Sequence, residues 1–546
     1  MQENSDARPL TPIWAWGLGL LPWVWIVPFN QYFWDDWLTA PLTGWQEQLD
    51  RWEGGAKHYL NPVTYFVLLP LGQWVFHLLM LICTVVTAWA VHNICASTRL
   101  LGAVAGFAGP ITLVIPLFHA RFSAANLEYI AASAAVYLAW MIALKKPTVS
   151  RRIISTLLMI YAIGVPSLAI VILAQWLHVS WRRASERGAI NFLKFQSLYP
   201  EPPIVVAAYA LIFQFVLNTK SRYGPSTGAL IEFMRGSIVL LTLTALIYWT
   251  TFRLAKQKIR PFTVTALSGA LAYLGFFPYF AVGYNPLSDF LPWRIRSEVT
   301  TGLTTRIFAT LIVLSVIAVC ALLFFRRKDN DTPILSSATL LCVPVSFATA
   351  VVTLGPMDWE SRHWLITWPP LAIFFIALIT MAGDKVQIAL VRTVFLVFLM
   401  AALTISSEYV VDSIKQKSIV SAVASELSAE RLKTDDADEI LVVVATVKST
   451  NRLNARFRTY RPYEWWGLVS QGMSVDPRRL KIMEPSDATS RGPGVCNPKY
   501  VATRISPEVN SGRFEALLKF SVRISLNPEP LLLCSDQVRD GYPKDR

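Results

Sequence analysis

The sequence is short of charge. Only 16% of its 546 residues are Asp, Glu, Lys or Arg, whereas ordinary soluble domains carry about 25%. Hydrophobic residues make up 54% of the chain, and the mean hydropathy is +0.43. A soluble protein of this size would lack the polar side chains needed to cover its surface. The composition therefore excludes an ordinary soluble enzyme and predicts an integral membrane protein.

The motifs of many soluble enzymes are absent as well. No GxGxxG or P-loop pattern occurs, which excludes the common nucleotide-binding folds. No spacing typical of zinc ligands is present, so no cofactor is certain and a divalent metal ion is left open. The net charge is +14, but no basic stripe with interleaved stacking aromatics accompanies it, so we expect no nucleic-acid partner. Lys and Arg held near lipid headgroups explain the charge better.

Cysteine is scarce too, with six residues in the chain. Cys496 and Cys534 are the only two in the C-terminal part, and in an oxidising compartment they could form a disulfide. The sequence leaves open whether they do. The other four lie in or beside apolar segments, where we expect them to pack as inert small hydrophobes: Cys83, Cys95, Cys320 and Cys342.

Long apolar runs are abundant, and several reach the roughly 20 residues that a bilayer requires. They occur at about 12–30, 63–91, 100–119, 123–144, 153–178, 203–219, 236–252, 262–284, 306–325, 333–355, 363–382 and 387–407. The nearly neutral start `MQENSDARPLTP` is unlike a signal-peptide n-region, so we expect the first run to be a retained span. The pattern predicts a polytopic α-helical membrane protein of about 12–13 spans.

Basic residues between the runs predict the orientation, because Lys and Arg favour cytoplasmic loops. They form four clusters: Lys145, Lys146, Arg151 and Arg152; Arg182, Arg183, Arg187 and Lys194; Arg253, Lys256, Lys258 and Arg260; Arg326, Arg327 and Lys328. All four become cytoplasmic if run 153–178 enters and leaves on the same side. Gly164 and Pro166 in `IGVPSLA` can break a helix there, so we predict a re-entrant hairpin. The alternative is one kinked helix.

This orientation places the unusual polar segments on the extracytoplasmic side. They include the first loop, 31–62, and everything after residue 407. We therefore expect a membrane domain over 1–407 and an extracytoplasmic domain over 408–546. The latter contains the strand-like segments `EILVVVAT`, `RLKIMEP`, `YVATRIS` and `ALLKFSVRISL`, which predict a small α/β or α+β fold. We expect the protein in a bacterial plasma membrane, with its site on the periplasmic side.

The first loop opens with `FWDDW`, where Asp35 and Asp36 stand between tryptophans at the end of the first apolar run. A carboxylate held partly out of water beside a second one has a raised pKa. That property suits a general base, which accepts a proton from a hydroxyl as a new bond forms to its oxygen. The alternative is a solvated pair of loop or helix-capping carboxylates.

Cationic residues on the same side could complete a site, because a guanidinium grips phosphate in a two-pronged manner. The candidates for a phosphate clamp are Arg294, Arg296, Arg362, His363 and Lys57. The candidates for acceptor or sugar contacts are His58, Glu128, Arg121, Tyr463 and Trp465. Headgroup contacts, ion pairs and core packing are the alternative readings of these residues.

A long first extracytoplasmic loop that opens with an Asp motif resembles the C-type (GT-C superfold) integral membrane glycosyltransferases. The `ESRHW` turn before a span, the `GVPS` hairpin and the C-terminal extracytoplasmic domain are also similar to that superfamily. The resemblance implies a polyprenyl-phosphate-linked sugar donor, with Asp35 or Asp36 as the base and basic residues on the lipid phosphate. It implies a glycan, lipid or protein as the acceptor.

Two other classes remain open from the sequence. A transporter or flippase for a lipid-linked glycan would show ionisable residues along its spans, broken helices in corresponding positions and an internal repeat. We find one candidate broken helix and no obvious repeat. A non-catalytic cell-envelope assembly protein would explain the C-terminal domain but would give the acidic pair no role.

Overall fold

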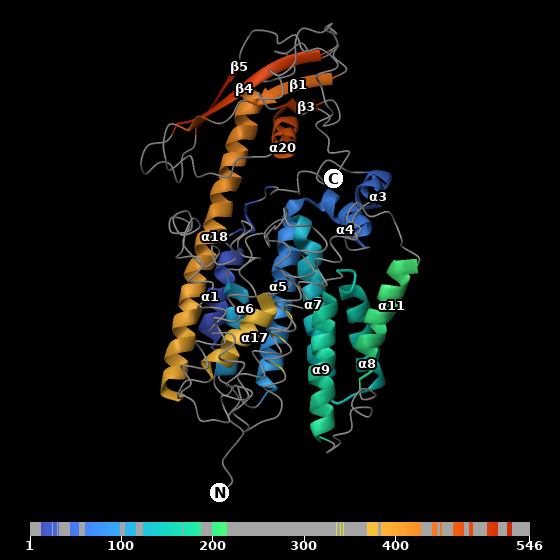
Figure 1. The fold of residues 1–546 in the computed structure, drawn as a ribbon. Helices are drawn as coiled ribbons and strands as arrows, with labels where there is room; N and C mark the ends of the chain where they lie inside the picture. Colours follow the sequence, from blue (N-terminus) through green and yellow to red (C-terminus); the bar gives the residue numbers. More distant parts are fainter. Residues whose placement is uncertain are drawn as a thin grey trace, which may run out of the picture.

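The computed structural model describes a helical bundle that carries a small β-sheet at one end (Figure 1). The described residues lie mainly in 12–215, 368–426 and the helix and strands between 439 and 526. The gaps are 25, 30, 32–43, 54–59, 99–103, 116–123, 166–167, 187–198, 216–367 except 335, 339 and 342, 381–383, 427–438, 445–447, 450–461, 474–479, 484–499 and 511–520. Residues 1–11 and 527–546 also lie outside the description.

The bundle is built from the apolar runs, where few charged side chains interrupt the helical pattern. Its elements are α1 (Ile13–Val24), α3 (Trp45–Glu53), α4 (Asn61–Leu68), η1 (Leu69–Leu71), α5 (Gln73–Ala96), α6 (Ala108–Val114), η4 (Ala124–Asn126), α7 (Leu127–Ala143), α8 (Val149–Ala162), α9 (Ala169–Glu186), α11 (Glu201–Phe215), α17 (Trp368–Ile379) and α18 (Asp384–Glu426). Within the described residues, α5 is the one helix long and apolar enough to cross a bilayer by length and composition. The number of spans therefore stays a prediction.

The apolar run at 63–91 is not one helix. Gly72 has a φ of +91°, in the region that favours glycine, and the chain turns there between η1 and α5. Pro62 occupies the first turn of α4, where its missing N–H leaves no hydrogen bond unmade. The structure thus divides this run into a short helix and a long one, which the hydropathy pattern did not reveal.

Helices α1 and α6 end at the side of the bundle where α5 and α7 begin, so these four helices alternate in direction. Trp23 at the end of α1 donates from Nε1 to the carbonyl of Leu113 at the end of α6, at 3.3 Å, so both helices end on the same side as the sheet. Aromatic and aliphatic residues from α4 and from the starts of α5 and α7 pack in the same buried cluster as Trp23. We call this side the sheet end of the bundle, and the opposite side the basic end.

The predicted break in run 153–178 is present. Helix α8 ends at Ala162 and α9 begins at Ala169, so the helix is interrupted within `IGVPSLA`. Arg183 near the end of α9 donates to the carbonyl of Ala143, which ends α7 just before α8 begins. One kinked helix would hold these two points at opposite ends of the bundle, so that alternative is wrong. Whether the hairpin enters a membrane stays a prediction.

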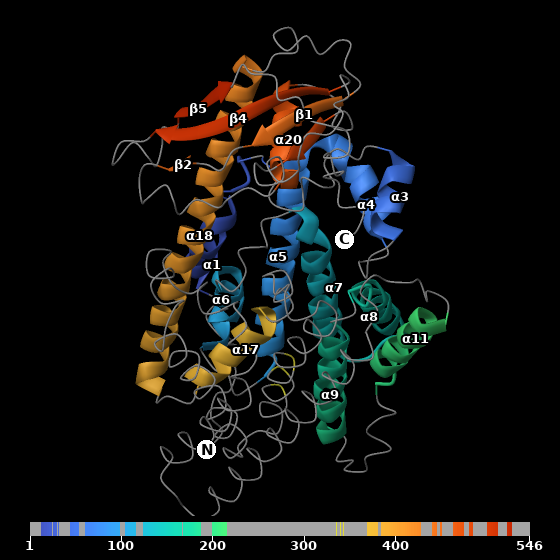
Figure 2. The same cartoon turned by 45° about the horizontal axis from the view of Figure 1, so that its top comes forward.

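Helix α18 crosses the expected domain boundary without interruption. Its 43 residues extend about 64 Å at 1.5 Å per residue. The first part packs on α1, α6 and α17, and the last part packs on α20 (Pro462–Met473) and the sheet (Figures 1 and 2). The change in composition near residue 407 therefore falls inside one helix and not in a linker.

The C-terminal sheet is mixed. Parallel strands β1 (Glu439–Val444), β3 (Leu480–Met483) and β4 (Tyr500–Asn510) form its centre, with β1 between the other two. Short β2 (Lys448–Ser449) and antiparallel β5 (Ser521–Leu526) pair with the far part of β4. Helix α20 lies in the connection from β1 to β3, after β2, and packs beside α18 (Figure 2). A parallel pair joined through a helix is the unit from which α/β domains are built.

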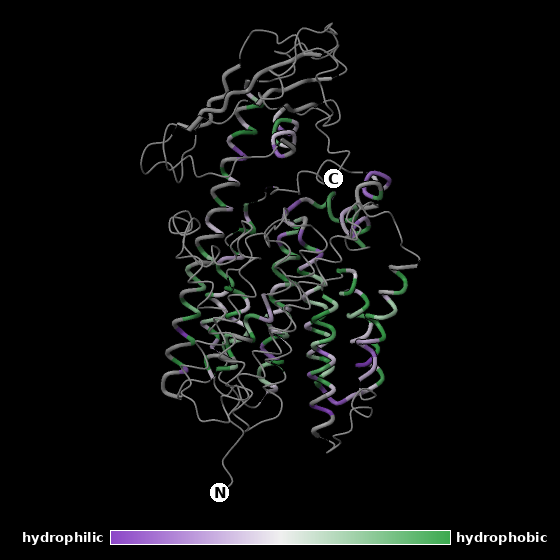
Figure 3. The backbone as a smooth tube through the Cα atoms, in the orientation of Figure 1, coloured by the Kyte–Doolittle hydropathy of each residue, from purple (hydrophilic) through white to green (hydrophobic). Residues whose placement is uncertain are grey.

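Hydrophobic residues predominate in many of the bundle helices (Figure 3), and a number of large apolar side chains are exposed. On α5 the exposed residues Trp74, Leu78 and Ile82 recur at the spacing of one helix face. Exposed apolar side chains occur on α1, α8, α11 and α18 as well. A soluble monomer rarely exposes apolar patches on this scale, so the outer surface favours contact with lipid.

Candidate functional site

The first loop enters and leaves at the sheet end of the bundle. It follows α1 and leads into α3 and α4, which lie beside the start of α7 (Figure 1). Gly44 donates its backbone N–H to Oε2 of Glu47 at 3.1 Å, which fixes the first turn of α3. Asp35 and Asp36 belong to this loop and lie outside the described residues.

The carboxylate of Glu128 is the one acidic candidate that the structure describes. Glu128 lies in the first turn of α7 and is 6% exposed, and Nδ2 of Asn61 donates to its Oε2. Tyr65, one turn after Asn61, donates its hydroxyl to the carbonyl of Ala124 at 2.8 Å. Two hydrogen bonds therefore join α4 to the start of α7, because neither buried group could remain unpaired at low cost.

Other buried polar residues lie in the elements of this end. Together with the Asn61–Glu128 pair they form what we call the polar layer: Gln31, Gln48, Asn61, Gln73, His77, Asn126 and Glu128. Gln73 and His77 are four residues apart and share one face of α5. Such a concentration of buried polar groups is unusual beside an apolar core, so this end is better suited to a polar ligand than the bundle interior.

Aromatic residues lie at the same helix ends as the polar layer. Tyr65 and Phe76 lie with ring centroids 5.3 Å apart, and Trp23 and Tyr409 belong to the same buried cluster. This cluster includes residues of α1, α4, α5 and α7, and it also includes Tyr409 and Val410 from the middle of α18, so it holds four helix ends against one long helix. A rigid support of this kind is what a positioned binding site requires.

The aromatic residues of α20 pack inside the C-terminal domain. Trp465 is 5% exposed and Trp466 is 9% exposed, and Glu464 beside them is also buried. The burial of Trp465 therefore favours core packing, the alternative reading, over a contact with a sugar ring. Tyr463 belongs to the first turn of the same helix, and its side chain is not among those described.

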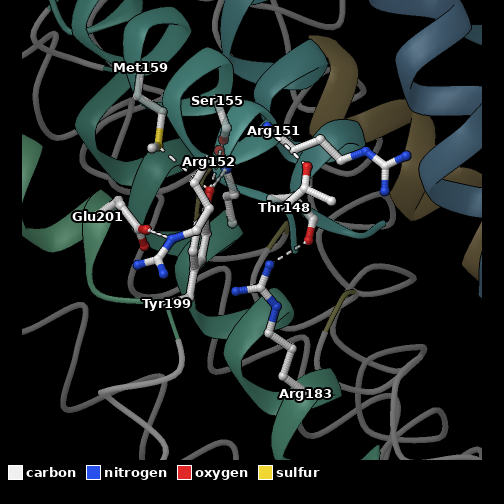
Figure 4. Close-up of polar contacts among 10 residues, drawn as sticks. Thr148, Arg151, Arg152, Ser155, Met159, Arg183, Tyr199 and Glu201 are labelled. Carbon is white, nitrogen blue, oxygen red and sulfur yellow. Dashed lines mark hydrogen bonds and ion pairs between the residues drawn. The ribbon is translucent and has the colours of Figure 1, made fainter. Parts of the chain in front are cut away.

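The basic end contains a hydrogen-bond network that the sequence analysis did not predict (Figure 4). The hydroxyl of Tyr199 accepts from Nε2 of Gln175 at 2.6 Å and lies 3.0 Å from Oγ of Ser155. Burial raises the pKa of Tyr199 to about 12, so the phenol stays protonated at neutral pH. Polar residues within apolar runs, such as Ser155 and Gln175, were the available signal for this network.

Arginine side chains extend the network between helices. Arg152 on α8 pairs with Glu201 at the start of α11, and Arg183 on α9 lies 4.9 Å above the ring of Tyr199. Arg183 also donates to the carbonyl of Ala143 at 2.9 Å. Arg182 donates to the carbonyl of Ser97 just after α5, at 3.3 Å. Two of the four predicted basic clusters thus meet at one end of the bundle, opposite the sheet.

A buried histidine lies one turn further into the bundle. Trp140 on α7 donates from Nε1 to Nδ1 of His178 on α9, at 3.1 Å, and both side chains are fully buried. His178 is not among the site residues predicted from the sequence. Its position one turn before the basic residues of α9, within an apolar run, was the available signal, because ionisable residues there are uncommon.

Most predicted site residues lie outside the described part of the chain. They are Asp35, Asp36, Lys57, His58, Arg121, Arg294, Arg296, Arg362 and His363, together with Cys496 and Cys534. Within the described residues, no group of His, Cys, Asp or Glu side chains could hold a metal ion. The proximity of the acidic pair to its expected phosphate clamp therefore stays a prediction.

No protein-family model matches this sequence, and no curated protein matches it either.

Proposed function

We propose that the protein is a membrane glycosyltransferase that moves a sugar from a polyprenyl-phosphate donor to an extracytoplasmic acceptor. The observation that carries the proposal is a division between the two ends of the bundle. The elements flanking the acidic first loop, the polar layer and the sheet share one end, and the described basic clusters share the other. Cationic loops favour the cytoplasm, so this arrangement supports an extracytoplasmic site.

The outer surface of the bundle supports a membrane location. Exposed apolar side chains on α1, α5, α8, α11 and α18 would meet lipid chains, and the polar layer would lie near the headgroups. A lipid-linked donor keeps its chain in the bilayer and its phosphate at the interface. A water-borne acceptor can reach the same depth, so both substrates could meet at the sheet end.

The chemistry follows from the residue types in the first loop. Asp35 or Asp36 would accept the proton of the acceptor hydroxyl as its oxygen bonds to the anomeric carbon of the sugar. The bond from that carbon to the phosphate breaks, and the lipid phosphate leaves with the electron pair. Arg294, Arg296 and Arg362 are the candidates to stabilise the negative charge that develops there.

Glu128 has a different role in this proposal. Its carboxylate is buried and accepts a hydrogen bond from Asn61, so it is already engaged by the protein. We assign it to positioning, because it fixes α4, which ends the first loop, against α7. This assignment replaces the expected direct contact between Glu128 and the acceptor.

The test is sugar transfer by Asp35→Asn, Asp36→Asn and the double variant. Each purified protein is placed in liposomes with a panel of polyprenyl-phosphate sugars, and donor consumption and glycosylated product are measured. We expect at least one single variant to lose about 100-fold or more in rate, as removal of a general base does. Full transfer by the double variant would contradict the proposal.

Glu47→Gln is the matched control for these variants. It removes a carboxylate from the same loop, while its amide oxygen can still accept the hydrogen bond from Gly44. We expect its transfer rate to stay within about twofold of the wild type, because Glu47 is only partly buried and the substitution keeps the hydrogen bond that caps α3. Equal losses in Glu47→Gln and the Asp variants would indicate a general effect of loop charge and not a catalytic base.

A flippase for a lipid-linked glycan is the second candidate. The interrupted helix between α8 and α9 favours it, because broken helices are common in transporters. The same liposomes distinguish the two functions. A flippase would move the donor between leaflets without consuming it, whereas a transferase consumes the donor only when an acceptor is present.

A further inference from the structure

The turn between α7 and α8 concentrates positive charge on exposed side chains. We define the basic turn as Lys145, Lys146 and Arg151, whose side chains are all exposed. We propose that the basic turn binds the headgroup of an anionic phospholipid in the leaflet at the basic end of the bundle. The proposal concerns lipid binding and is independent of sugar transfer.

The neighbouring cations are already engaged, which singles out these three. Arg152 is paired with Glu201, so its charge is compensated. Arg182 donates to the carbonyl of Ser97, just after α5, and Arg183 donates to the carbonyl of Ala143, the last residue of α7. Both arginines thus stabilise a helix C-terminus. These arginines hold the bundle together, and their hydrogen-bonding capacity is partly used.

Among the residues that the structure describes, no side chain of the basic turn pairs with a carboxylate. The guanidinium of Arg151 donates from Nη1 to the carbonyl of Lys146 at 2.9 Å, which holds its charge beside the two lysines. The hydroxyl of Thr148 accepts from the N–H of Arg151 at 3.3 Å and caps α8.

The dipole of α8 adds to the positive potential. Its N-terminus points to this turn, and the first turn of the helix contains no acidic residue. Helix N-termini favour negative charge, and arginines placed there are otherwise unfavourable. An anion at the turn would relieve the repulsion among the three cations and the helix terminus.

Exposed apolar residues indicate that the anion belongs to a lipid. Val149 is 75% exposed, and Ile153 and Leu157 on the same face of α8 are 54% and 60% exposed. A soluble acidic partner or a free phosphate would leave this apolar face in water. A phospholipid satisfies both features, because its chains would lie among the apolar residues around α8 and its phosphate near the turn.

The experiment compares lipid affinities by native mass spectrometry of the full chain in neutral detergent. Phosphatidylglycerol and phosphatidylcholine with identical chains are titrated into the wild type and into Lys145→Gln/Lys146→Gln/Arg151→Gln. We expect the wild type to bind phosphatidylglycerol more tightly than phosphatidylcholine. The Gln variant should bind phosphatidylglycerol more weakly, by about fivefold for each cation removed, because one cation near an anionic lipid contributes about that factor. Binding of phosphatidylcholine should not change.

Two controls keep the result interpretable. Lys417→Gln removes an exposed cation from α18 on the side of the sheet and should leave the affinity for phosphatidylglycerol unchanged. Lys145→Arg/Lys146→Arg/Arg151→Lys keeps the charges and should retain binding. Equal phosphatidylglycerol affinity in the wild type and the Gln variant would overturn the proposal. A loss of phosphatidylcholine affinity in the Gln variant as large as its loss of phosphatidylglycerol affinity would also overturn it. Competition by inorganic phosphate alone would also overturn it, because the site would then recognise a free anion.

Discussion

At the scale of single residues, buried polar groups separate the two ends of the bundle. Glu128 and Asn61 form a pair at the sheet end, and Tyr199 is the centre of a network at the basic end. Both are embedded among apolar neighbours, where an unpaired polar group is destabilising. Their substitution therefore measures how far each network stabilises the fold.

The first prediction concerns Asn61. Replacing Asn61 by Ala removes the donor to Glu128 and leaves a buried carboxylate with one partner fewer. We expect a loss of about 1–3 kcal/mol in stability, seen as a lower thermal midpoint in detergent. Glu128→Gln should have a smaller effect, since its amide oxygen can still accept from Asn61. A larger loss for Glu128→Gln than for Asn61→Ala would contradict this account.

The second prediction concerns Tyr199. The Tyr199→Phe variant leaves Gln175 and Ser155 without their shared partner, and we expect destabilisation of about 1–3 kcal/mol. Met159→Leu is the control, because Met159 lies beside Tyr199 but its sulfur makes only a weak contact with the Tyr199 hydroxyl, at 4.0 Å. Thermal unfolding followed by tryptophan fluorescence compares the two. Equal midpoints for both variants would mean that the network is dispensable.

At the scale of elements, the approach of α20 to α18 decides how the C-terminal domain is attached. A Cβ atom on Gly472 would lie 2.6 Å from Cβ of Val423 and 2.9 Å from the carbonyl of Val420. Both distances are too short for any side chain, so the two helices can pack this closely only because residue 472 is glycine. The contact fixes α20, and with it the crossover from β1 to β3, on the upper part of α18.

The third prediction follows from this contact. Gly472→Ala should force α20 away from α18 and destabilise their packing by about 1–3 kcal/mol. We expect faster proteolysis of the C-terminal part, followed by mass spectrometry of the fragments. Gly17→Ala is the control, because a Cβ there meets nothing within 4 Å and Ala favours the helix. Unchanged proteolysis of Gly472→Ala would show that the two helices can separate without consequence.

At the scale of the whole molecule, orientation is the property on which the proposed function depends. The described helices alternate in direction, and the hairpin of α8 and α9 returns both of its basic segments to one end. The sheet lies at the other end on the extension of α18 (Figure 2). If the basic end is cytoplasmic, the first loop and the sheet are both extracytoplasmic.

The fourth prediction tests this orientation. Cysteine is introduced at the exposed positions Ser150, near the basic end, and Ala424, near the sheet, in a chain without its native cysteines. We expect a membrane-impermeant maleimide to label Ala424→Cys on intact cells and Ser150→Cys only after permeabilisation. The reverse pattern would place the acidic loop in the cytoplasm and would exclude a periplasmic transferase.

The sequence by itself predicted the interruption of run 153–178 and the strand of `EILVVVAT`, which is β1, and the membrane class that it predicts stays a prediction. These features depend on local composition, on Gly and Pro, and on short-range pattern. Only the tertiary structure decided the turn at Gly72, the continuity of α18, the burial of Trp465 and the partners of Glu128 and Tyr199. The burial of Trp465 and the partners of Glu128 and Tyr199 depend on which distant segment packs against the residue, and hydropathy along one chain contains no information about that neighbour.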